Sequence, residues 1–150
     1  MADAETKPQS VLFVCTMNAV RSPMAAAMLR HLTRGRLYIE SAGVKAGELD
    51  PLAVEAMAEI GLEIGKHRPR RFEDLEDGSF DLVITLSPEA QHKAMELTRT
   101  AATQVEYWAT LDPTITEGSR EQRLMSYRMV RDQLMQRLKQ RFLAPAAADT

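Results

Sequence analysis

The chain has 150 residues, of which 45% are hydrophobic, so it is long enough for one domain with a buried core. Its 19 basic and 21 acidic side chains give a formal net charge of −2, which argues against a protein that coats nucleic acid or an anionic membrane. No apolar run approaches the roughly eighteen residues of a membrane helix, and residues 1–10 lack the basic and apolar parts of a signal peptide. We therefore expect a single cytoplasmic domain over residues 1–150, with its core near residues 10–142 and short flexible tails.

The first predicted element is a buried strand at Val11–Val14, where the apolar residues include β-branched and aromatic types. A turn follows this strand. Ser22 and Pro23 then supply an N-cap hydroxyl and a first-turn proline for a helix over Met24–Leu32, which is rich in Ala, Met and Leu. The chain thus begins with a strand, a loop and a helix.

A second strand and a second helix repeat this order. The strand begins at Leu37 and ends in the segment Ser-Ala-Gly at residues 41–43. Asp50 and Pro51 open the helix, which closes at Gly61. The apolar residues of this helix are Leu52, Val54, Met57 and Ile60.

The third strand, Asp81–Leu86, is the clearest of the chain, and Ser87 with Pro88 caps a third helix. Gln104–Trp108 is a weaker fourth strand, and a loop over Thr110–Gly118 follows it. The apolar residues of the third helix are Ala90, Ala94 and Leu97.

The last predicted element is the longest helix. The sequence Ser-Arg-Glu-Gln at residues 119–122 has the pattern of a capping box, and apolar residues then recur at steps of three and four. We expect the tail Ala144–Thr150 to be frayed. The apolar stripe of this helix consists of Leu124, Tyr127, Val130, Leu134, Leu138 and Phe142.

Strands that alternate with helices in this way predict an α/β fold, an open and mostly parallel four-stranded sheet with helices on both faces. No internal repeat and no linker indicates a second domain. Ligands of such sheets bind beyond the carboxyl ends of the strands, where the chain changes direction across the sheet. The loop from Cys15 to Ser22 lies at this edge, between the first strand and the first helix.

We predict that this loop cradles a phosphate group. Its backbone N–H groups can point at an anion held at the helix N-terminus. Arg21 offers two parallel donors to phosphate oxygens, and Asn18 tolerates the left-handed backbone that a tight loop needs. The predicted phosphate-binding residues are Thr16, Met17, Asn18, Ala19, Val20, Arg21 and Ser22.

Cys15 is the only cysteine of the chain, which excludes an internal disulfide and a cysteine-based metal cluster. Hydrogen-bond donors, a helix N-terminus and a guanidinium favour the nucleophilic, ionised form of a thiol, and the Ser22 hydroxyl can donate to the sulfur. We therefore predict that Cys15 is a nucleophile; the alternative is a buried structural cysteine beside a solvated Arg21. We expect no metal and no cofactor, because the histidines are too scattered to form a site. They are His31, His67 and His92.

The sequence Cys-Thr-Met-Asn-Ala-Val-Arg-Ser-Pro at residues 15–23 resembles the signature loop of the low-molecular-weight protein-tyrosine phosphatase family. Ser-Ala-Gly at residues 41–43, the strand Asp81–Leu86 and Asp-Pro at residues 112–113 match landmarks of that family in the same order. The resemblance spans roughly residues 10–142. It implies a flavodoxin-like fold with the spatial strand order 2-1-3-4.

The resemblance also implies a phosphatase reaction. Cys15 attacks phosphorus, Arg21 and the loop amides stabilise the transferring oxygens, and Asp112 acts as general acid before activating water against the cysteinyl-phosphate. Without the resemblance, an ordinary Asp-Pro turn explains Asp112 equally well. The implied substrate is a phosphorylated protein or a small phosphoester, with inorganic phosphate or a similar oxyanion in the loop. We expect neither nucleic acid nor a membrane as a partner.

The chain departs from the family pattern around the predicted site. Thr114 and Ile115 follow the Asp-Pro pair, where many relatives carry aromatic residues that stack on phosphotyrosine, so a preference for tyrosine is not implied. Met17 occupies a position that is usually glycine. Val20 stands where many relatives have a second cysteine, so an oxidised Cys15 has no resolving partner in the loop.

Two other functions are compatible with the same loop. Related arsenate reductases pass oxidation through further cysteines, so with Cys15 alone such an enzyme needs an external thiol or a redoxin. The other is a phosphate- or oxyanion-binding module without turnover.

Two further features each allow a functional and a structural interpretation. The basic run Lys66–Arg71 can steer a phosphorylated substrate, but acidic residues follow it directly, which favours a solvated surface. Trp108 either lines the site or fills the core at the end of the fourth strand, and we favour the core.

Overall fold

Four parallel strands form one sheet, as the alternating pattern predicts. The strands are β1 (Ser10–Cys15), β2 (Tyr38–Gly43), β3 (Leu82–Thr85) and β4 (Gln104–Tyr107), in the spatial order β2-β1-β3-β4. The computed structural model describes residues 7–75, 79–98 and 102–143, and the predicted frayed tail Ala144–Thr150 lies outside them. Because the strands are parallel, their carboxyl ends meet at one edge of the sheet.

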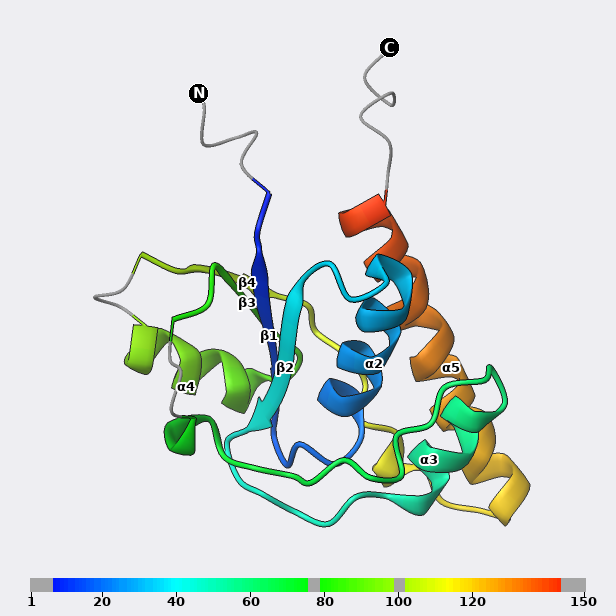
Figure 1. Ribbon diagram of the computed structural model, residues 1–150. Helices are drawn as coiled ribbons and strands as arrows, with labels where there is room; N and C mark the ends of the chain where they lie inside the picture. Colours follow the sequence, from blue (N-terminus) through cyan, green and yellow to red (C-terminus); the bar gives the residue numbers. More distant parts are fainter. Residues whose placement is uncertain (1–6, 76–78, 99–101, 144–150) are drawn as a thin grey trace.

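Helices cover both faces of this sheet (Figure 1). One face carries α2 (Arg21–Thr33), α3 (Pro51–Ala58) and α5 (Arg120–Leu138), and the other carries α4 (Pro88–Thr98). Short helical turns lie at Phe72–Asp74, Pro113–Ile115 and Lys139–Leu143. None of the helices within the described ranges is both long and apolar enough to cross a membrane.

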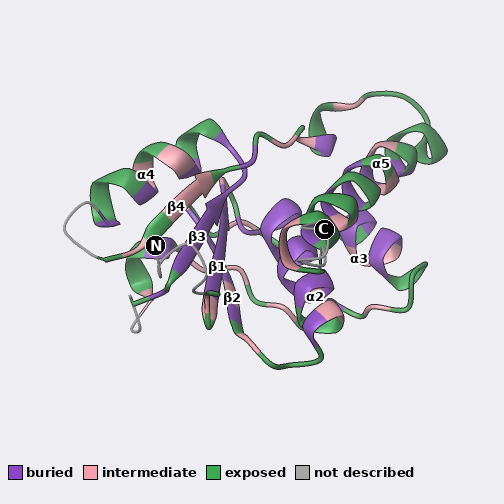
Figure 2. Ribbon diagram, turned by 90° about the horizontal axis from the view of Figure 1, so that it is seen from above, coloured by how far each residue is buried: buried purple, intermediate pink, exposed green. Residues whose placement is uncertain are grey.

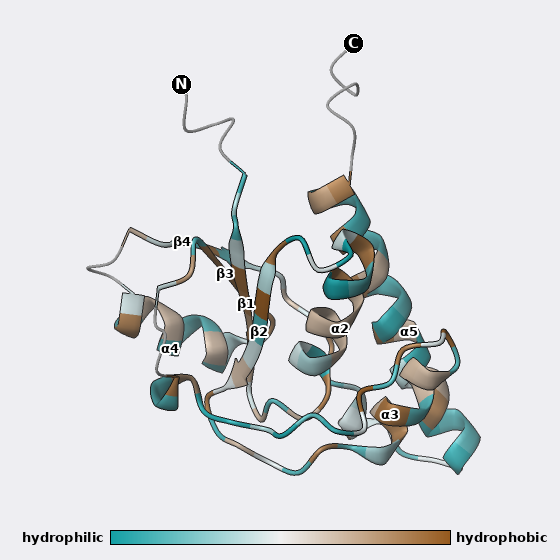
Figure 3. Ribbon diagram, in the orientation of Figure 1, coloured by the Kyte–Doolittle hydropathy of each residue, from teal (hydrophilic) through white to brown (hydrophobic). Residues whose placement is uncertain are grey.

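The side chains of β1 alternate between two hydrophobic cores, one on each face of the sheet. Val11, Phe13 and Cys15 share a cluster with residues of α2, α3 and α5. Leu12 and Val14 belong to a smaller cluster with α4. Figure 2 shows the central strands as buried, and Figure 3 shows β1 and β3 as apolar. β1 is therefore a central strand, and its position fixes Cys15 at the carboxyl edge of the sheet.

Three of the predicted helix starts are confirmed. The Asp50 carboxylate caps α3 by accepting a hydrogen bond from the second residue of the helix. The hydroxyl of Ser87 accepts a hydrogen bond from the N–H of Ala90 at the start of α4. Ser119 and Gln122 form both bonds of the predicted capping box of α5.

The predicted N-cap role of Ser22 is wrong. α2 begins at Arg21, and its N-cap residue, Val20, makes no side-chain capping bond. Ser22 lies inside the first turn, where its hydroxyl contacts the loop that precedes the helix instead of capping a backbone N–H. A second difference is at the end of α3, which finishes at Ala58, so that Ile60 falls outside the helix and is 39% exposed.

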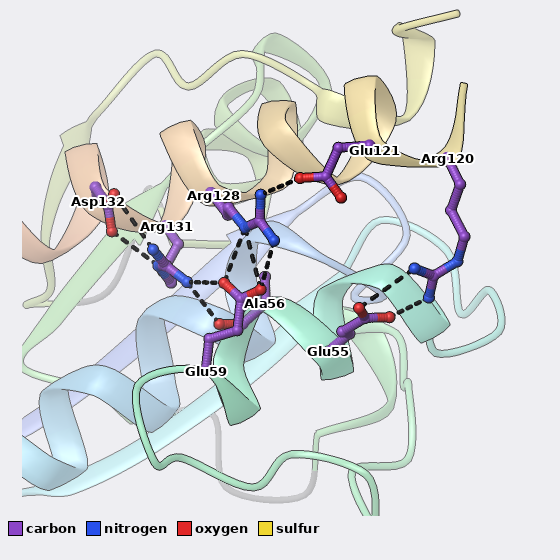
Figure 4. Close-up of polar contacts among 8 residues, drawn as sticks. All are labelled: Glu55, Ala56, Glu59, Arg120, Glu121, Arg128, Arg131 and Asp132. Atoms are coloured by element: carbon purple, nitrogen blue, oxygen red, sulfur yellow. Dashed lines mark hydrogen bonds and ion pairs between the residues drawn. The ribbon is translucent and has the colours of Figure 1, made fainter. Parts of the chain in front are cut away.

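Ion pairs hold α3 against α5 (Figure 4). Glu59, directly after α3, accepts hydrogen bonds from Arg128 and Arg131 of α5, and these bonds lower the pKa of Glu59 to about 2. Arg120, the first residue of α5, pairs with Glu55, which lies one helical turn before Glu59. Isolated exposed ion pairs contribute little to stability, but here the single carboxylate of Glu59 joins two arginines of α5. These pairs therefore join the middle and the end of α3 to α5.

Candidate active site

A cavity of about 580 Å³ opens at the edge of the sheet where β1 ends. Cys15 is the last residue of β1, and the loop after it leads into α2 at the lower edge of the sheet in Figure 1. The loops that follow β2, β3 and β4 form the surrounding walls. The cavity thus brings together the side chains of Cys15, Arg21 and Asp112, which are far apart in the sequence.

The predicted phosphate-binding residues divide into two groups. Asn18 and Ser22 are fully buried and do not line the cavity. The residues that line it are Thr16, Met17, Ala19, Val20 and Arg21.

The carbonyl groups of the loop are bound from outside by residues 44–50, the segment between β2 and α3. Backbone N–H groups of this segment donate to four carbonyl oxygens of the loop. The pairs are Val44 to Cys15 at 3.0 Å, Lys45 to Thr16 at 2.8 Å, Gly47 to Met17 at 2.9 Å and Asp50 to Ala19 at 3.2 Å.

These outer bonds set the direction of the loop amides. In a planar trans peptide unit, the N–H of each residue points opposite to the carbonyl of the residue before it. The N–H groups of Thr16, Met17, Asn18 and Val20 therefore point to the inside of the loop. Within the described residues, none of these four N–H groups donates to a protein acceptor. The loop can offer them together to an anion above Cys15.

Gly43, the last residue of β2, allows the loop to pass close to the sheet. A Cβ atom at this position would lie 2.7 Å from the backbone nitrogen of Asn18 and 2.9 Å from the carbonyl carbon of Met17. Both are backbone atoms, so no side-chain movement can relieve the overlap. The close approach gives a physical reason for glycine at the end of the Ser-Ala-Gly segment.

Asn18 joins the loop to three neighbouring segments. Its backbone is left-handed with φ 55°, as predicted, and its side chain is fully buried. The side-chain Nδ2 donates to the hydroxyls of Ser22 at 2.8 Å and Ser41 at 3.0 Å. The side-chain Oδ1 accepts a hydrogen bond from the backbone N–H of Arg70 at 2.9 Å and lies 3.0 Å from Nε2 of His67.

The basic run Lys66–Arg71 is therefore more than a solvated surface. His67 and Arg70 both contact Asn18, and the guanidinium of Arg70 donates to the carbonyl of Ser41 at 3.1 Å. Burial lowers the pKa of His67, and the charge of Arg70 adds to this effect. These residues hold the loop from behind, a role that sequence reasoning missed.

Replacing Asn18 by alanine should destabilise the fold by about 2–4 kcal/mol. The backbone N–H of Arg70 and the hydroxyl of Ser41 lose a hydrogen-bond partner, and alanine disfavours a positive φ. Glycine at the same position loses the same hydrogen bonds but accepts the backbone conformation. We expect Asn18→Gly to be more stable than Asn18→Ala by about 1 kcal/mol. Urea unfolding of the two variants measures the difference. Equal stability would show that the left-handed backbone carries no cost.

The sulfur of Cys15 sits at the floor of the cavity and is surrounded by polar groups. Cys15 is 2% exposed. The hydroxyl of Ser22 lies 2.9 Å from Sγ, and the backbone N–H of Ser22 donates to Sγ at 3.4 Å. Both groups can stabilise a negative charge on sulfur, and the thiolate is the nucleophilic form of cysteine.

Arg21 is 7% exposed, and the loop after β4 positions its guanidinium. Nη1 donates to the carbonyl of Thr110 at 2.9 Å and approaches the carbonyl of Leu86 at 3.5 Å. Nη2 lies 3.9 Å from Oδ2 of Asp112. Two carbonyls thus hold one end of the guanidinium, and its other donors can bind an oxyanion in the cavity.

The two carboxylate oxygens of Asp112 have different surroundings. Oδ1 accepts hydrogen bonds from the N–H of Thr114 at 3.0 Å and from the Thr114 hydroxyl at 2.8 Å, so Asp112 caps the short helical turn that follows. Oδ2 faces Arg21. One oxygen therefore fixes the side chain, and the other can exchange a proton with a group bound in the cavity.

The rim of the cavity has no aromatic residue among those described. The Cε atom of Met17 lies 3.1 Å from the position that a Cβ would take on Gly47, so the methionine folds over this glycine. Leu111 and Thr114 line the other side. Trp108 is 5% exposed and belongs to the core, as favoured from the sequence.

Comparisons with known proteins give a family match over nearly the whole chain. A family model described as low molecular weight phosphotyrosine protein phosphatase matches residues 10–148. An arsenate reductase of Shouchella clausii is 36% identical over 130 residues, which cover 86% of this chain and 91% of that protein.

Two solved structures illustrate the similarity of fold. A low molecular weight protein tyrosine phosphatase from T. tengcongensis is similar with a TM-score of 0.74 at 25% identity, covering 91% of this chain and 99% of that chain. An arsenate reductase from Archaeoglobus fulgidus has a TM-score of 0.69 at 28% identity, covering 87% of this chain and 96% of that chain. Relatives named for two different activities therefore share this fold.

Proposed function

Because this chain belongs to the low molecular weight phosphotyrosine protein phosphatase family, we propose that it hydrolyses phosphate monoesters through a cysteinyl-phosphate on Cys15. The observation that carries the proposal is the arrangement of one cavity. Inward N–H groups and Arg21 surround a site for an oxyanion, Cys15 lies at its floor, and Asp112 lies at its wall. The substrate is a phosphorylated protein or a small phosphoester.

The first half-reaction forms a covalent bond to sulfur. The Cys15 thiolate attacks phosphorus in line with the leaving oxygen, so that an S–P bond forms as the P–O bond breaks. Asp112 gives its proton to the leaving oxygen, which departs as an alcohol or a phenol. The loop amides and Arg21 stabilise the charge on the three remaining oxygens.

The second half-reaction restores the enzyme. The Asp112 carboxylate takes a proton from a water molecule that attacks phosphorus from the side of the departed group. The S–P bond breaks, the thiolate of Cys15 is released, and inorganic phosphate leaves the cavity. No electron is transferred in either step, so a single cysteine suffices.

Arsenate reduction is the second candidate, favoured by relatives that carry the name arsenate reductase. Reduction of arsenate to arsenite takes two electrons, which thiols supply as they become a disulfide. Cys15 is the only cysteine of the chain, so a second thiol must come from another molecule. This requirement favours hydrolysis over reduction for the isolated protein.

The deciding experiment follows two reactions of the purified protein, with Cys15 reduced beforehand and the reductant removed. We expect repeated turnover of p-nitrophenyl phosphate without any thiol, and no arsenite release under the same conditions. Arsenite release that requires added thiol or a redoxin, in the absence of ester hydrolysis, would instead assign the chain as a reductase. Phosphate binding without either reaction would indicate a binding module.

A further inference from the structure

Two exposed glutamates at the mouth of the cavity take no part in the proposed chemistry. Glu48 and Glu89 line the cavity together with Asp50 and Asp112. Asp50 is already engaged, because it caps α3 and accepts a hydrogen bond from the hydroxyl of Tyr127 at 2.6 Å. Asp112 is the proposed acid. Glu48 and Glu89 are therefore the two lining carboxylates without an assigned role.

The strand order places these two glutamates on opposite sides of Cys15. Glu48 lies in the segment after β2, and Glu89 is the second residue of α4, which follows β3. Because β1 lies between β2 and β3, the two segments flank the loop that follows Cys15. The backbones of β2 and β3 are about 10 Å apart, because two strand spacings separate them. The mouth of the cavity therefore carries a negative charge on each side.

No cation neutralises these charges within the described residues. Neither Glu48 nor Glu89 forms an ion pair there, although a carboxylate oxygen of Glu89 lies 3.3 Å from the hydroxyl of Thr16. Arg21 is the one basic residue among the lining residues, and it is buried at the floor. Lys45 lies in the segment of Glu48 but does not line the cavity. The rim thus repels acidic groups and attracts basic ones.

The placement of the two charges on opposite sides of Cys15 suits an extended peptide that crosses the cavity. Consecutive residues of an extended chain advance about 3.3 Å, so the neighbours on either side of a phosphorylated residue are about 7 Å apart and the next pair about 13 Å apart. Because Glu48 and Glu89 follow strands on either side of β1, long lysine and arginine side chains at these positions can extend toward one glutamate on each side. Building on the proposed phosphatase function, we propose that the cavity selects phosphorylated protein segments with basic residues on both sides of the phosphorylated residue.

The experiment compares two phosphotyrosine peptides of equal length, one with Lys and Arg on both sides of the phosphotyrosine and one with Asp and Glu. Their dissociation constants are measured with Cys15→Ser, which holds the phosphate without turning it over, and their kcat/KM values with the wild-type chain. We expect a preference of about tenfold or more for the basic peptide at low salt, since each exposed charge pair contributes about two- to fivefold. The preference should shrink as salt is added.

Removal of the two rim charges tests their role. In Glu48→Gln combined with Glu89→Gln, the ratio of the two dissociation constants should fall to about twofold or less. Asp81→Asn is the matched control, because this exposed carboxylate lies at the amino end of β3, on the opposite edge of the sheet, and should leave the ratio unchanged. Equal affinity for the two peptides, or a preference that survives the double substitution, would overturn the proposal. The binding ratio decides the question even if the chain hydrolyses neither peptide, a result that would count against the phosphatase function instead.

Discussion

Cys15→Ser should lower kcat for p-nitrophenyl phosphate by at least about 10³-fold, because a serine hydroxyl is a much weaker nucleophile than a cysteine sulfur. The replacement changes one atom at the floor of the cavity. The surrounding donors remain, because the loop amides are fixed by backbone bonds to residues 44–50 and Arg21 is held by the carbonyl of Thr110. We therefore expect the variant to bind inorganic phosphate with an affinity close to that of the wild type.

Two measurements separate loss of the nucleophile from loss of the fold. Thermal unfolding of Cys15→Ser should match that of the wild type, and titration with inorganic phosphate should raise the melting temperature of both proteins, because a ligand of the native state stabilises it. Retention of hydrolysis by Cys15→Ser would refute the covalent route. Loss of phosphate binding together with activity would show that sulfur, and not the loop amides, holds the anion.

The fold and the floor of the site could be predicted from the sequence because their signals are local. The apolar run Val11–Val14 indicates a buried strand by its composition alone, and the alternation with helices places Cys15 at the ligand-binding edge. Ser22 shows the limit of local patterns. Ser-Pro is a frequent helix start, but hydrogen bonds with Asn18 and contact with the Cys15 sulfur determine where its hydroxyl lies.

The support behind the loop could not be predicted, because it consists mainly of backbone hydrogen bonds. Residues 44–50 bind the loop carbonyls through N–H groups that almost every residue type carries, so their identity gives no signal. Arg70 likewise binds Asn18 through its main chain. His67 does carry a side-chain signal, but it lies in a basic run whose charge suggested a surface in water.

Asp112→Asn should slow the hydrolysis of phenyl phosphate by about 10²–10⁴-fold, because an amide cannot donate the proton that a poor leaving group requires. The loss should be far smaller for p-nitrophenyl phosphate, whose leaving group is stable as an anion. Asparagine keeps the oxygen that accepts hydrogen bonds from Thr114, so the short helical turn after Asp112 should persist.

The difference between the two substrates on one variant is its own control, since any distortion of the cavity slows both. The alternative role for Asp112 is to position Arg21. Oδ2 of Asp112 lies 3.9 Å from Nη2 of Arg21, so a purely electrostatic role for this carboxylate, as a partner of the guanidinium, predicts equal losses for good and poor leaving groups. Equal losses would therefore assign Asp112 to the positioning of Arg21, whereas losses that grow as the leaving group becomes more basic require a proton on Oδ2.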